Sequence, residues 1–181
     1  NMLFFFLVIF SVPSFAAVST LEKIKNGGVL KVCSEAGYLP LEMKTPSGNW
    51  VGFDVDMMRA YTKTLQVKLE MLDTKWDGII PSLISKKCDA IASSMAKTST
   101  REKVVAFSDS YFRNQFLIAV KHTEKNIEKY KTISDFNSKD VTIAVKTGAS
   151  PDLYLQDSKI LNKAKILKFD ADADTISAVL S

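Results

Sequence analysis

Residues 89–95, Asp89-Ala90-Ile91-Ala92-Ser93-Ser94-Met95, place a short apolar run directly before two serines. Asp89 to Ala92 has the length and composition of a short buried strand. We predict helices on both sides of it, at Trp76 to Ile84 and at Ser99 to Val105. A strand between two helices is typical of an α/β fold with a largely parallel sheet.

The same alternation extends along the rest of the chain in both directions. The further strands are predicted at Val29 to Ser34, Val67 to Leu72, Gln115 to Lys121, Val141 to Val145 and Lys165 to Phe169. The further helices are predicted at Val55 to Leu65, near Asp152 to Gln156, and from Ala173 onward. Turn residues at Thr147-Gly148-Ala149-Ser150-Pro151 lead into one of these helices.

Composition excludes several classes of function. The 181 residues are 46% hydrophobic and 24% charged, which predicts a folded globular protein. The net charge is +4, but no basic stripe with interleaved aromatic residues is present, so we expect no nucleic-acid partner. His122 is the only histidine and no ligand cluster accompanies it, so we expect no metal and no cofactor. The chain also has no Gly-x-Ser-x-Gly elbow and no phosphate loop, which favours a protein that is not an enzyme.

The N-terminal residues differ from the rest of the chain. Met2 to Val12 is almost unbroken apolar sequence, and Ser14-Phe15-Ala16-Ala17 follows it. This pattern predicts a signal peptide at residues 1–16, cut after Ala16, and therefore a periplasmic protein. The alternative is an uncleaved membrane anchor, although the run is short for a transmembrane helix. Because no basic segment precedes the run, we expect that the original N-terminus is missing.

The two cysteines, Cys33 and Cys88, would meet an oxidising compartment after export. Cys33 falls near the end of one predicted strand, and Cys88 falls just before the start of another. In neighbouring parallel strands these positions lie far apart, whereas a disulfide needs Cα atoms within about 7 Å. We therefore expect two free, buried cysteines.

Four segments together give the chain its family resemblance. They are Glu35-Ala36-Gly37-Tyr38-Leu39-Pro40-Leu41-Glu42, Gly52-Phe53-Asp54-Val55-Asp56, Trp76-Asp77-Gly78-Ile79-Ile80-Pro81-Ser82-Leu83, and Asp89 to Met95 followed by Thr98, Arg101 and Phe107-Ser108-Asp109-Ser110-Tyr111. In this order and spacing they resemble the extracellular solute-binding proteins for polar amino acids, the receptor components of ABC importers.

The resemblance implies an α/β bilobal fold, the type II periplasmic-binding-protein fold. We expect a first lobe at residues 17–114 that is nearly complete but lacks its C-terminal return. We expect an incomplete second lobe at residues 115–181, with Tyr111 to Leu117 leading into the crossing between the lobes. The family's second-lobe aspartate, which pairs with the ligand's α-ammonium group, would lie beyond Ser181.

The resemblance also implies ligand-binding roles for residues after the central strand. Arg101 matches the arginine that grips the ligand α-carboxylate, and a guanidinium has the planar fork of donors that this task needs. Ser93 and Ser94 match the turn that meets the α-amino and carboxylate ends of the ligand. Ala96 departs from the family pattern, because a serine or threonine hydroxyl usually holds the ligand there. The alternative for Arg101 is an arginine on a helix surface.

Three further first-lobe residues match positions of the family's pocket. Tyr38 and Trp76 match its aromatic walls, which can enclose an aliphatic stem or a cation. Trp76 could instead be ordinary core packing. Glu35 matches an acidic position that contacts the far end of polar or basic side chains, and it favours a cationic or amide ligand. The alternative for Glu35 is a surface glutamate.

In the second lobe, Gly148, Ala149 and Ser150 resemble the family's carboxylate-binding turn at a helix start, where free backbone N–H groups can accept an anion. Lys146 precedes this turn and is placed to approach the ligand side chain. The resulting prediction is a monomeric receptor that binds a polar amino acid and delivers it to a membrane permease. Two alternatives stay open: a periplasmic cyclohexadienyl dehydratase that acts on prephenate or arogenate, and a ligand-sensing module of a larger protein.

Overall fold

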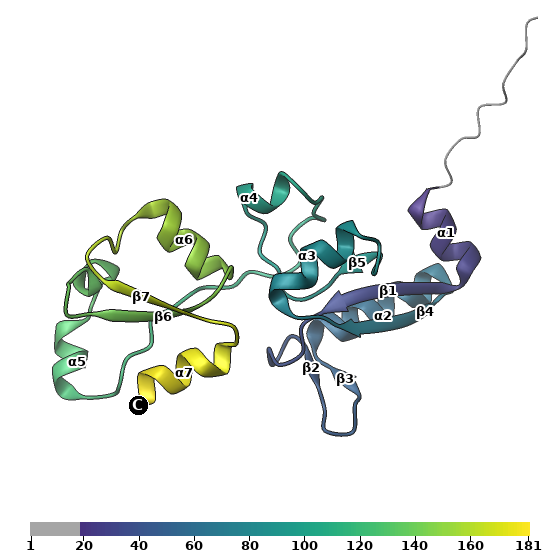
Figure 1. Ribbon diagram of the computed structural model, residues 1–181. Helices are drawn as coiled ribbons and strands as arrows, with labels where there is room; N and C mark the ends of the chain where they lie inside the picture. The colour runs from purple at the N-terminus through teal and green to yellow at the C-terminus, as the bar shows by residue number, and fades with distance from the viewer. Residues whose placement is uncertain (1–18) are drawn as a thin grey trace, which may run out of the picture.

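The computed structural model describes residues 19–181, so the expected signal peptide at residues 1–16 lies outside the described residues. Two lobes lie side by side, one formed by elements α1 to α4 and the other by elements α5 to α7 (Figure 1). The chain passes from one to the other through the long connection between α4 and α5. Across residues 19–181, no helix has the length and apolar character needed to cross a membrane.

The first lobe holds nine elements. In chain order they are α1 (Thr20–Gly27), β1 (Val29–Ser34), β2 (Met43–Lys44), β3 (Trp50–Val51), α2 (Phe53–Leu65), β4 (Lys68–Asp73), α3 (Trp76–Ile84), β5 (Ala90–Ile91) and α4 (Ser99–Glu102). The second lobe contains α5 (Glu124–Lys129), the 3-10 turn η1 (Ile133–Phe136), β6 (Thr142–Lys146), α6 (Ser150–Ser158), β7 (Lys165–Phe169) and α7 (Asp172–Leu180).

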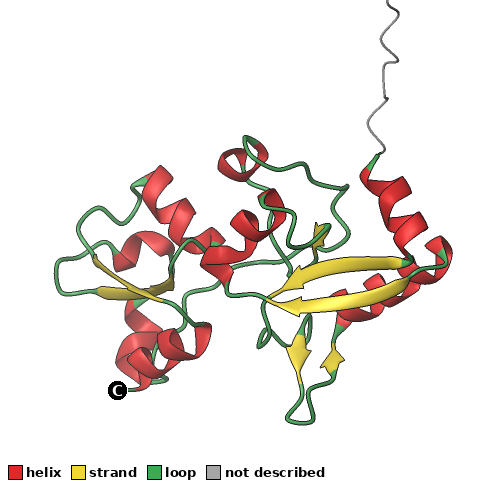
Figure 2. Cartoon of the chain, turned by 45° about the vertical axis from the view of Figure 1, so that its right-hand side comes forward, coloured by secondary structure: helices red, strands yellow, loops and turns green. Residues whose placement is uncertain are grey.

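The first-lobe sheet is parallel, in the order β4-β1-β5, with Val32 opposite both Met71 and Ala90. In its central strand β1, the successive residues Val32, Cys33 and Ser34 are all buried. Since successive side chains of a strand point to opposite faces, β1 is covered on both faces of the sheet. Leu30 and Val32 pack with α1 and α2, while Cys33 packs with Ile79 of α3. Helices on both faces of a parallel sheet confirm the predicted α/β class (Figure 2).

The second lobe is built on two parallel strands, β6 and β7, with Ala144 opposite Leu167. Helix α6 packs against β6, and α7 packs against both strands. The buried core comprises Phe136, Val141, Ile143, Val145 and Leu161. Helix α3 and strand β7 have the predicted bounds, whereas the helix expected at Ser99 to Val105 ends already at Glu102.

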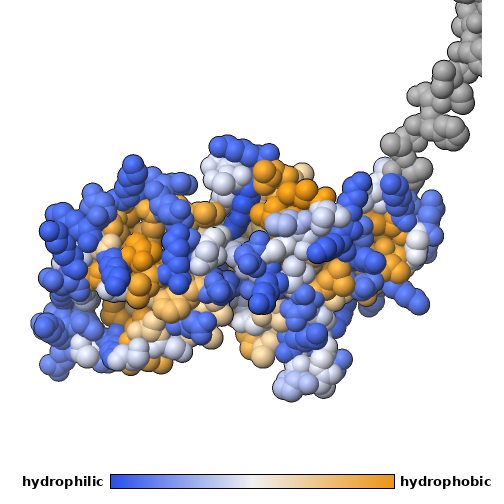
Figure 3. Space-filling model, viewed as in Figure 1, coloured by the Kyte–Doolittle hydropathy of each residue, from blue (hydrophilic) through white to orange (hydrophobic). Residues whose placement is uncertain are grey.

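The strand predicted at Gln115 to Lys121 is wrong. Among the described residues, no strand pairs with this segment, which runs through the connection between the lobes. Its composition is strand-like, but a strand needs a neighbouring strand to take up its backbone hydrogen bonds. Its apolar side chains are consequently exposed, and Leu117 reaches 89%. Apolar surface also shows on the second lobe in Figure 3, at the left of the view.

The expectation of free cysteines is also wrong, because Cys33 and Cys88 form a disulfide with Cα atoms 5.7 Å apart. The error lay in the assumed register of the two strands. β5 is two residues long and its start lies beside the end of β1, with Cys33 opposite Ile91, so Cys88 lies near Cys33 after the bend at Asp89. Both cysteines face α3, where they pack with Ile79.

Gly52 joins the small β2–β3 hairpin to α2 and fixes the start of that helix. Its φ of 124° lies in the region that favours glycine, and an added Cβ would lie 2.3 Å from the Leu41 carbonyl oxygen. This close approach lets the Asp54 backbone N–H donate to that same carbonyl at 2.9 Å. The Asp54 side chain is thereby placed under the neighbouring β5 turn, where it is fully buried.

Candidate ligand-binding cleft

A cavity of about 1190 Å³ is lined by residues of both lobes. In the first lobe, its wall lies at the carboxyl ends of β1 and β5, which meet at one edge of the parallel sheet. Glu35 follows β1 and Ser93 and Ser94 follow β5, so the two strand ends bring these three side chains together. In open α/β sheets this edge is where ligands bind.

Arg101 is buried between the two lobes, next to residues that line this cleft, rather than on the helix surface, and only 5% of the residue is exposed. Thr98 caps α4 by accepting a hydrogen bond from the Arg101 backbone N–H, which starts the short helix and directs the side chain inward. The guanidinium donates to the Ala96 carbonyl at 2.7 Å and, in the second lobe, to the Gly148 carbonyl at 3.0 Å. A longer contact of 3.4 Å reaches Ser150 Oγ.

Trp76 is the first residue of α3, and two cationic side chains lie over its indole ring. The Arg101 Cζ lies 5.2 Å from the centre of the indole, and the Lys146 Nζ lies 5.3 Å from it. Both distances are within the range of cation–π attraction. Burial lowers the pKa of Arg101, but a guanidinium keeps its proton in proteins, so Arg101 stays charged beside the ring.

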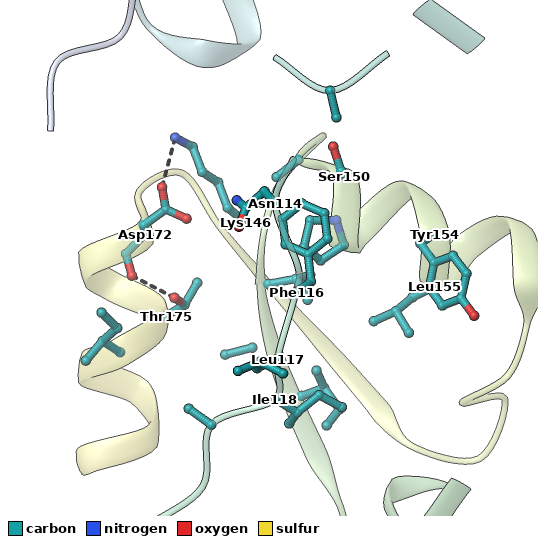
Figure 4. Close-up of a pocket in the computed structure, with 18 of the residues that line it drawn as sticks. Asn114, Phe116, Leu117, Ile118, Lys146, Ser150, Tyr154, Leu155, Asp172 and Thr175 are labelled. Atoms are coloured by element: carbon teal, nitrogen blue, oxygen red, sulfur yellow. Dashed lines mark hydrogen bonds and ion pairs between the residues drawn. The ribbon is translucent and has the colours of Figure 1, made fainter. Parts of the chain in front are cut away.

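Lys146 is the last residue of β6, is 8% exposed, and reaches across to the first lobe. Its ammonium forms an ion pair with Glu35 and a longer one, at 3.4 Å, with Asp172 at the start of α7. Figure 4 shows Lys146 and Asp172 joined at one end of the second-lobe wall. The other Glu35 oxygen accepts a hydrogen bond from the Trp76 backbone N–H at 3.2 Å. Glu35 is therefore part of the cleft and is already paired with a cation.

Of the remaining predicted residues, Ala149 and Ser150 also line the cavity, whereas Gly148 does not. Tyr38 and Ala96 lie in its first-lobe wall. In the second-lobe turn, Gly148 N donates to the Asp152 side chain at 2.9 Å and Ala149 N donates to the Lys146 carbonyl at 3.2 Å. These two amides are thus used within the chain, so the turn offers fewer free N–H groups to an anion than expected.

Two buried carboxylates behind the serines were not singled out from the sequence. Glu42 accepts hydrogen bonds from Ser93 Oγ at 2.9 Å and from Ser94 Oγ at 3.0 Å. Asp54 accepts from Ser94 N at 2.7 Å and from the Tyr111 hydroxyl at 3.1 Å. Both acids belong to the motif segments given above, but a motif does not reveal that an acidic residue within it is buried. An inward position beside apolar neighbours was the available signal.

Burial and the neighbouring carboxylates raise the pKa values of two groups in this wall. Burial raises the pKa of Glu42 to about 7, and the charges of Asp54 and Glu35 add to the shift against the hydrogen bonds from the serines. Burial, together with the Asp54 charge, raises the pKa of the Tyr111 hydroxyl. Among the described residues, no cluster of three or more potential ligands is arranged to hold a metal ion. The wall is acidic and able to exchange a proton near neutral pH.

Comparison with known proteins places this architecture in a family. Residues 30–174 match the model of the bacterial extracellular solute-binding proteins, family 3, and the chain belongs to that family. An L-arginine-binding protein of Pseudomonas aeruginosa is 38% identical over 106 residues, which are 59% of this chain and 38% of that protein. The ABC transporter arginine-binding protein 1 of Escherichia coli K12 is 34% identical over 139 residues, which are 77% of this chain and 52% of that protein.

Among solved structures, an ancestral amino acid-binding protein described as a precursor of cyclohexadienyl dehydratase is 39% identical, with a TM-score of 0.84. The match covers 90% of this chain and 71% of that one. The chain therefore shares the bilobal fold of amino acid-binding proteins, and it spans about half or less of the length of the two curated relatives.

Proposed function

We propose that this chain is part of an extracellular receptor that binds a polar amino acid between its two lobes. The observation that carries the proposal is the position of Arg101. Its guanidinium is buried beside the cleft, over Trp76, with hydrogen bonds to both lobes. A buried cation with a planar set of donors suits the α-carboxylate of an amino acid. Because it contacts both lobes, a carboxylate bound there would favour the closed arrangement.

The charges of the cleft favour a cationic or amide side chain over an acidic one. Glu35 and Asp172 both approach the Lys146 ammonium, so this end of the cleft holds two carboxylates and one cation. Glu42 and Asp54 add negative charge behind the serines. An acidic ligand side chain would meet this excess, whereas a guanidinium or ammonium would reduce it. Relatives whose names specify arginine fit the same chemistry.

We place the lobe boundary between residues 114 and 115. The Tyr111 hydroxyl donates to Asp54, and the Asn114 side chain donates to the Tyr38 hydroxyl at 3.4 Å, so both residues attach to the first lobe. The connection after them is exposed until Lys121, whose carbonyl accepts from Asn126 in the second lobe. Hinge motion at this connection would open and close the cleft.

The partner implied by this role is the membrane permease of an ABC importer, with the receptor acting as a monomer in the periplasm, without enzymatic activity or cofactor. Family membership and the ABC transporter relative support this assignment. A disulfide between Cys33 and Cys88 supports an oxidising compartment, because such bonds are rare in the cytosol.

Isothermal titration calorimetry tests the proposed function directly. The chain would be titrated with L-arginine, L-lysine, L-histidine, L-glutamine and L-glutamate. Binding of at least one cationic or amide amino acid, with L-glutamate weaker than the best of them, is the expected result. Heat from none of the five would contradict the receptor assignment.

A dehydratase-like enzyme is the second candidate, favoured by the similarity to a precursor of cyclohexadienyl dehydratase. Such an enzyme needs a protonated acid beside the leaving hydroxyl. Glu35 is instead held as an ion pair with Lys146, and Glu42 makes its hydrogen bonds to Ser93 and Ser94. These contacts favour the receptor. Formation of phenylpyruvate from prephenate in the presence of the chain would favour the dehydratase over the receptor.

A further inference from the structure

Two buried carboxylates accept hydrogen bonds from the two serine hydroxyl groups of the cleft wall. Glu42 Oε1 and Oε2 accept from Ser93 Oγ and Ser94 Oγ at 2.9 and 3.0 Å. Asp54 Oδ2 accepts from Ser94 N at 2.7 Å and also lies 3.2 Å from Ser94 Oγ. Glu42 and Asp54 are 1% and 0% exposed, so their hydrogen bonds are made to the protein and not to bulk water.

Ser94 has an unusual backbone that these contacts hold in place. Its φ is +49°, in the left-handed region that a residue with a Cβ adopts at a cost on the order of 1 kcal/mol. The hydrogen bond from Ser94 N to the Asp54 carboxylate is charge-assisted and offsets such a cost. Asp54 also accepts from the Tyr111 hydroxyl at 3.1 Å, which ties the connection between the lobes to the same carboxylate.

The direction of each serine hydroxyl proton determines whether that serine can donate a hydrogen bond to a ligand or only accept one. A serine hydroxyl has one proton and two lone pairs, and an ionised carboxylate can only accept. Ser93 therefore directs its proton toward Glu42, and Ser94 directs its proton toward the carboxylates of Glu42 and Asp54. Ser93 Oγ also accepts from the Glu35 backbone N–H at 3.0 Å. Ser94 Oγ, in the cleft wall, is left with acceptor capacity.

We propose that Glu42 and Asp54 are positioning residues for the cleft. Their carboxylates hold Ser94 in its left-handed conformation and accept hydrogen bonds from the serine hydroxyls, so that the wall presents an oxygen acceptor and negative charge to the ammonium group of the ligand. This inference rests on the proposed function. It adds to that function a specificity determinant that acts through the two serines and that couples binding to a proton.

The coupling of ligand binding to proton release follows from the hydrogen bonds between Glu42 and the serines. A protonated Glu42 would itself donate to one serine, which would then turn its own proton toward the cleft and oppose an ammonium group. The titratable groups that face Glu42 are Asp54, Glu35 and the Tyr111 hydroxyl. Since an ammonium group favours the ionised form, amino acid binding near neutral pH releases a proton from Glu42.

The binding experiment compares the wild-type chain with Glu42→Gln, which keeps the volume of the side chain. Glu70→Gln, on the exposed face of β4, is the matched control. Calorimetry with L-arginine, L-lysine and L-glutamine at pH 6.5, in two buffers of different ionisation enthalpy, gives the affinity and the protons released. The wild type and the control release a fraction of a proton, whereas Glu42→Gln binds about tenfold more weakly and releases none. Equal affinity and equal proton release in Glu42→Gln would overturn the proposal.

A ligand-free measurement separates this inference from the proposed function. In the wild-type chain, nuclear magnetic resonance follows the Glu42 carboxyl carbon and the Ser94 amide between pH 4 and 9. Both signals should share a midpoint near 7, and Asp54→Asn should shift the Ser94 amide upfield. A midpoint near the ordinary value of 4.5, or a Ser94 amide that ignores Asp54→Asn, refutes the positioning roles even if every amino acid binds. Absence of binding by the wild type refutes the receptor alone.

Discussion

The Lys146 ammonium of the second lobe forms an ion pair with Glu35 of the first lobe, directly beside the face of Trp76. This pair puts a cation of the protein at the end of the cleft where a cationic ligand side chain would lie. The protein thus supplies its own partner for Glu35, and a ligand that enters must share or replace it.

Replacing Lys146 by methionine should shift the preference of the cleft toward cationic ligands. The change removes the positive charge between Glu35 and Asp172 and keeps an apolar stem over Trp76. We expect the affinity ratio of L-arginine to L-glutamate to rise at least about tenfold, because about 1.4 kcal/mol is a modest electrostatic change at a site with 8% exposure. Calorimetry measures the ratio. Lys139→Met, at an exposed position, is the control, and an unchanged ratio in Lys146→Met would contradict the charge argument.

Replacing Arg101 by lysine should weaken binding of every amino acid that binds the wild type. An ammonium keeps the charge but cannot contact the Ala96 carbonyl, Gly148 and a ligand carboxylate with one planar fork. We expect a loss of about 2 kcal/mol or more, which is roughly a thirtyfold rise in Kd. The comparison is with Lys103→Ala, an exposed change two residues away. Undiminished affinity in Arg101→Lys would remove the carboxylate-binding role.

The stability of the free chain should fall as the pH rises toward 7 and beyond. The folded chain raises the pKa of Glu42 from 4.5 to about 7 through burial, so it retains a proton that the unfolded chain releases. The stabilisation is fully present below about pH 4.5 and is lost as the pH passes 7, with an upper limit of roughly 3 kcal/mol. Urea unfolding at pH 5 and pH 8 measures the difference. Glu42→Gln should remove this component, and an equal pH dependence in the variant would show another group to be responsible.

The disulfide should contribute substantially to the stability of the first lobe. Cys33 and Cys88 are 55 residues apart, and closing a loop of that length restricts the unfolded chain by about 4 kcal/mol in the chain-entropy description. The double variant Cys33→Ser and Cys88→Ser should therefore unfold at a lower urea concentration than the oxidised wild type. Thiol titration of the unfolded, unreduced wild type should detect no free thiol. Two free thiols, or equal stability of the double variant, would contradict this prediction.

Local pattern was sufficient for the elements whose neighbours are close in sequence. Helix α3 and strand β7 have the predicted bounds because apolar spacing and turn residues mark both of their ends. The segment Gln115 to Lys121 has the same strand-like composition, but its conformation depends on a partner strand, which local composition does not reveal. The disulfide was missed for a similar reason. The sequence does not show that the start of β5 pairs with the end of β1, and this register brings Cys88 close to Cys33.

The cleft was predictable where the family motifs name the residues. The structure brings the side chains of Arg101, Trp76 and Lys146 together, and each of these positions was selected from the sequence. The contacts of Glu42 and Asp54 with the serines were not predictable, because they depend on how α2 and the β2–β3 hairpin pack beneath the turn after β5. Hydrogen bonds between segments some 40 to 50 residues apart leave no periodic signal in the sequence.

The two walls of the cleft are built differently, and in the proposed receptor this difference would set the order of the binding steps. The first-lobe wall is cross-linked by Cys33 and Cys88 and held by buried carboxylates, whereas the second lobe contributes chiefly Lys146 and the turn at Gly148. We therefore expect an amino acid to bind first to the cross-linked first-lobe wall, and the second lobe to close over it afterwards. Stopped-flow fluorescence of Trp76 would then show a fast phase that depends on ligand concentration and a slower phase that does not.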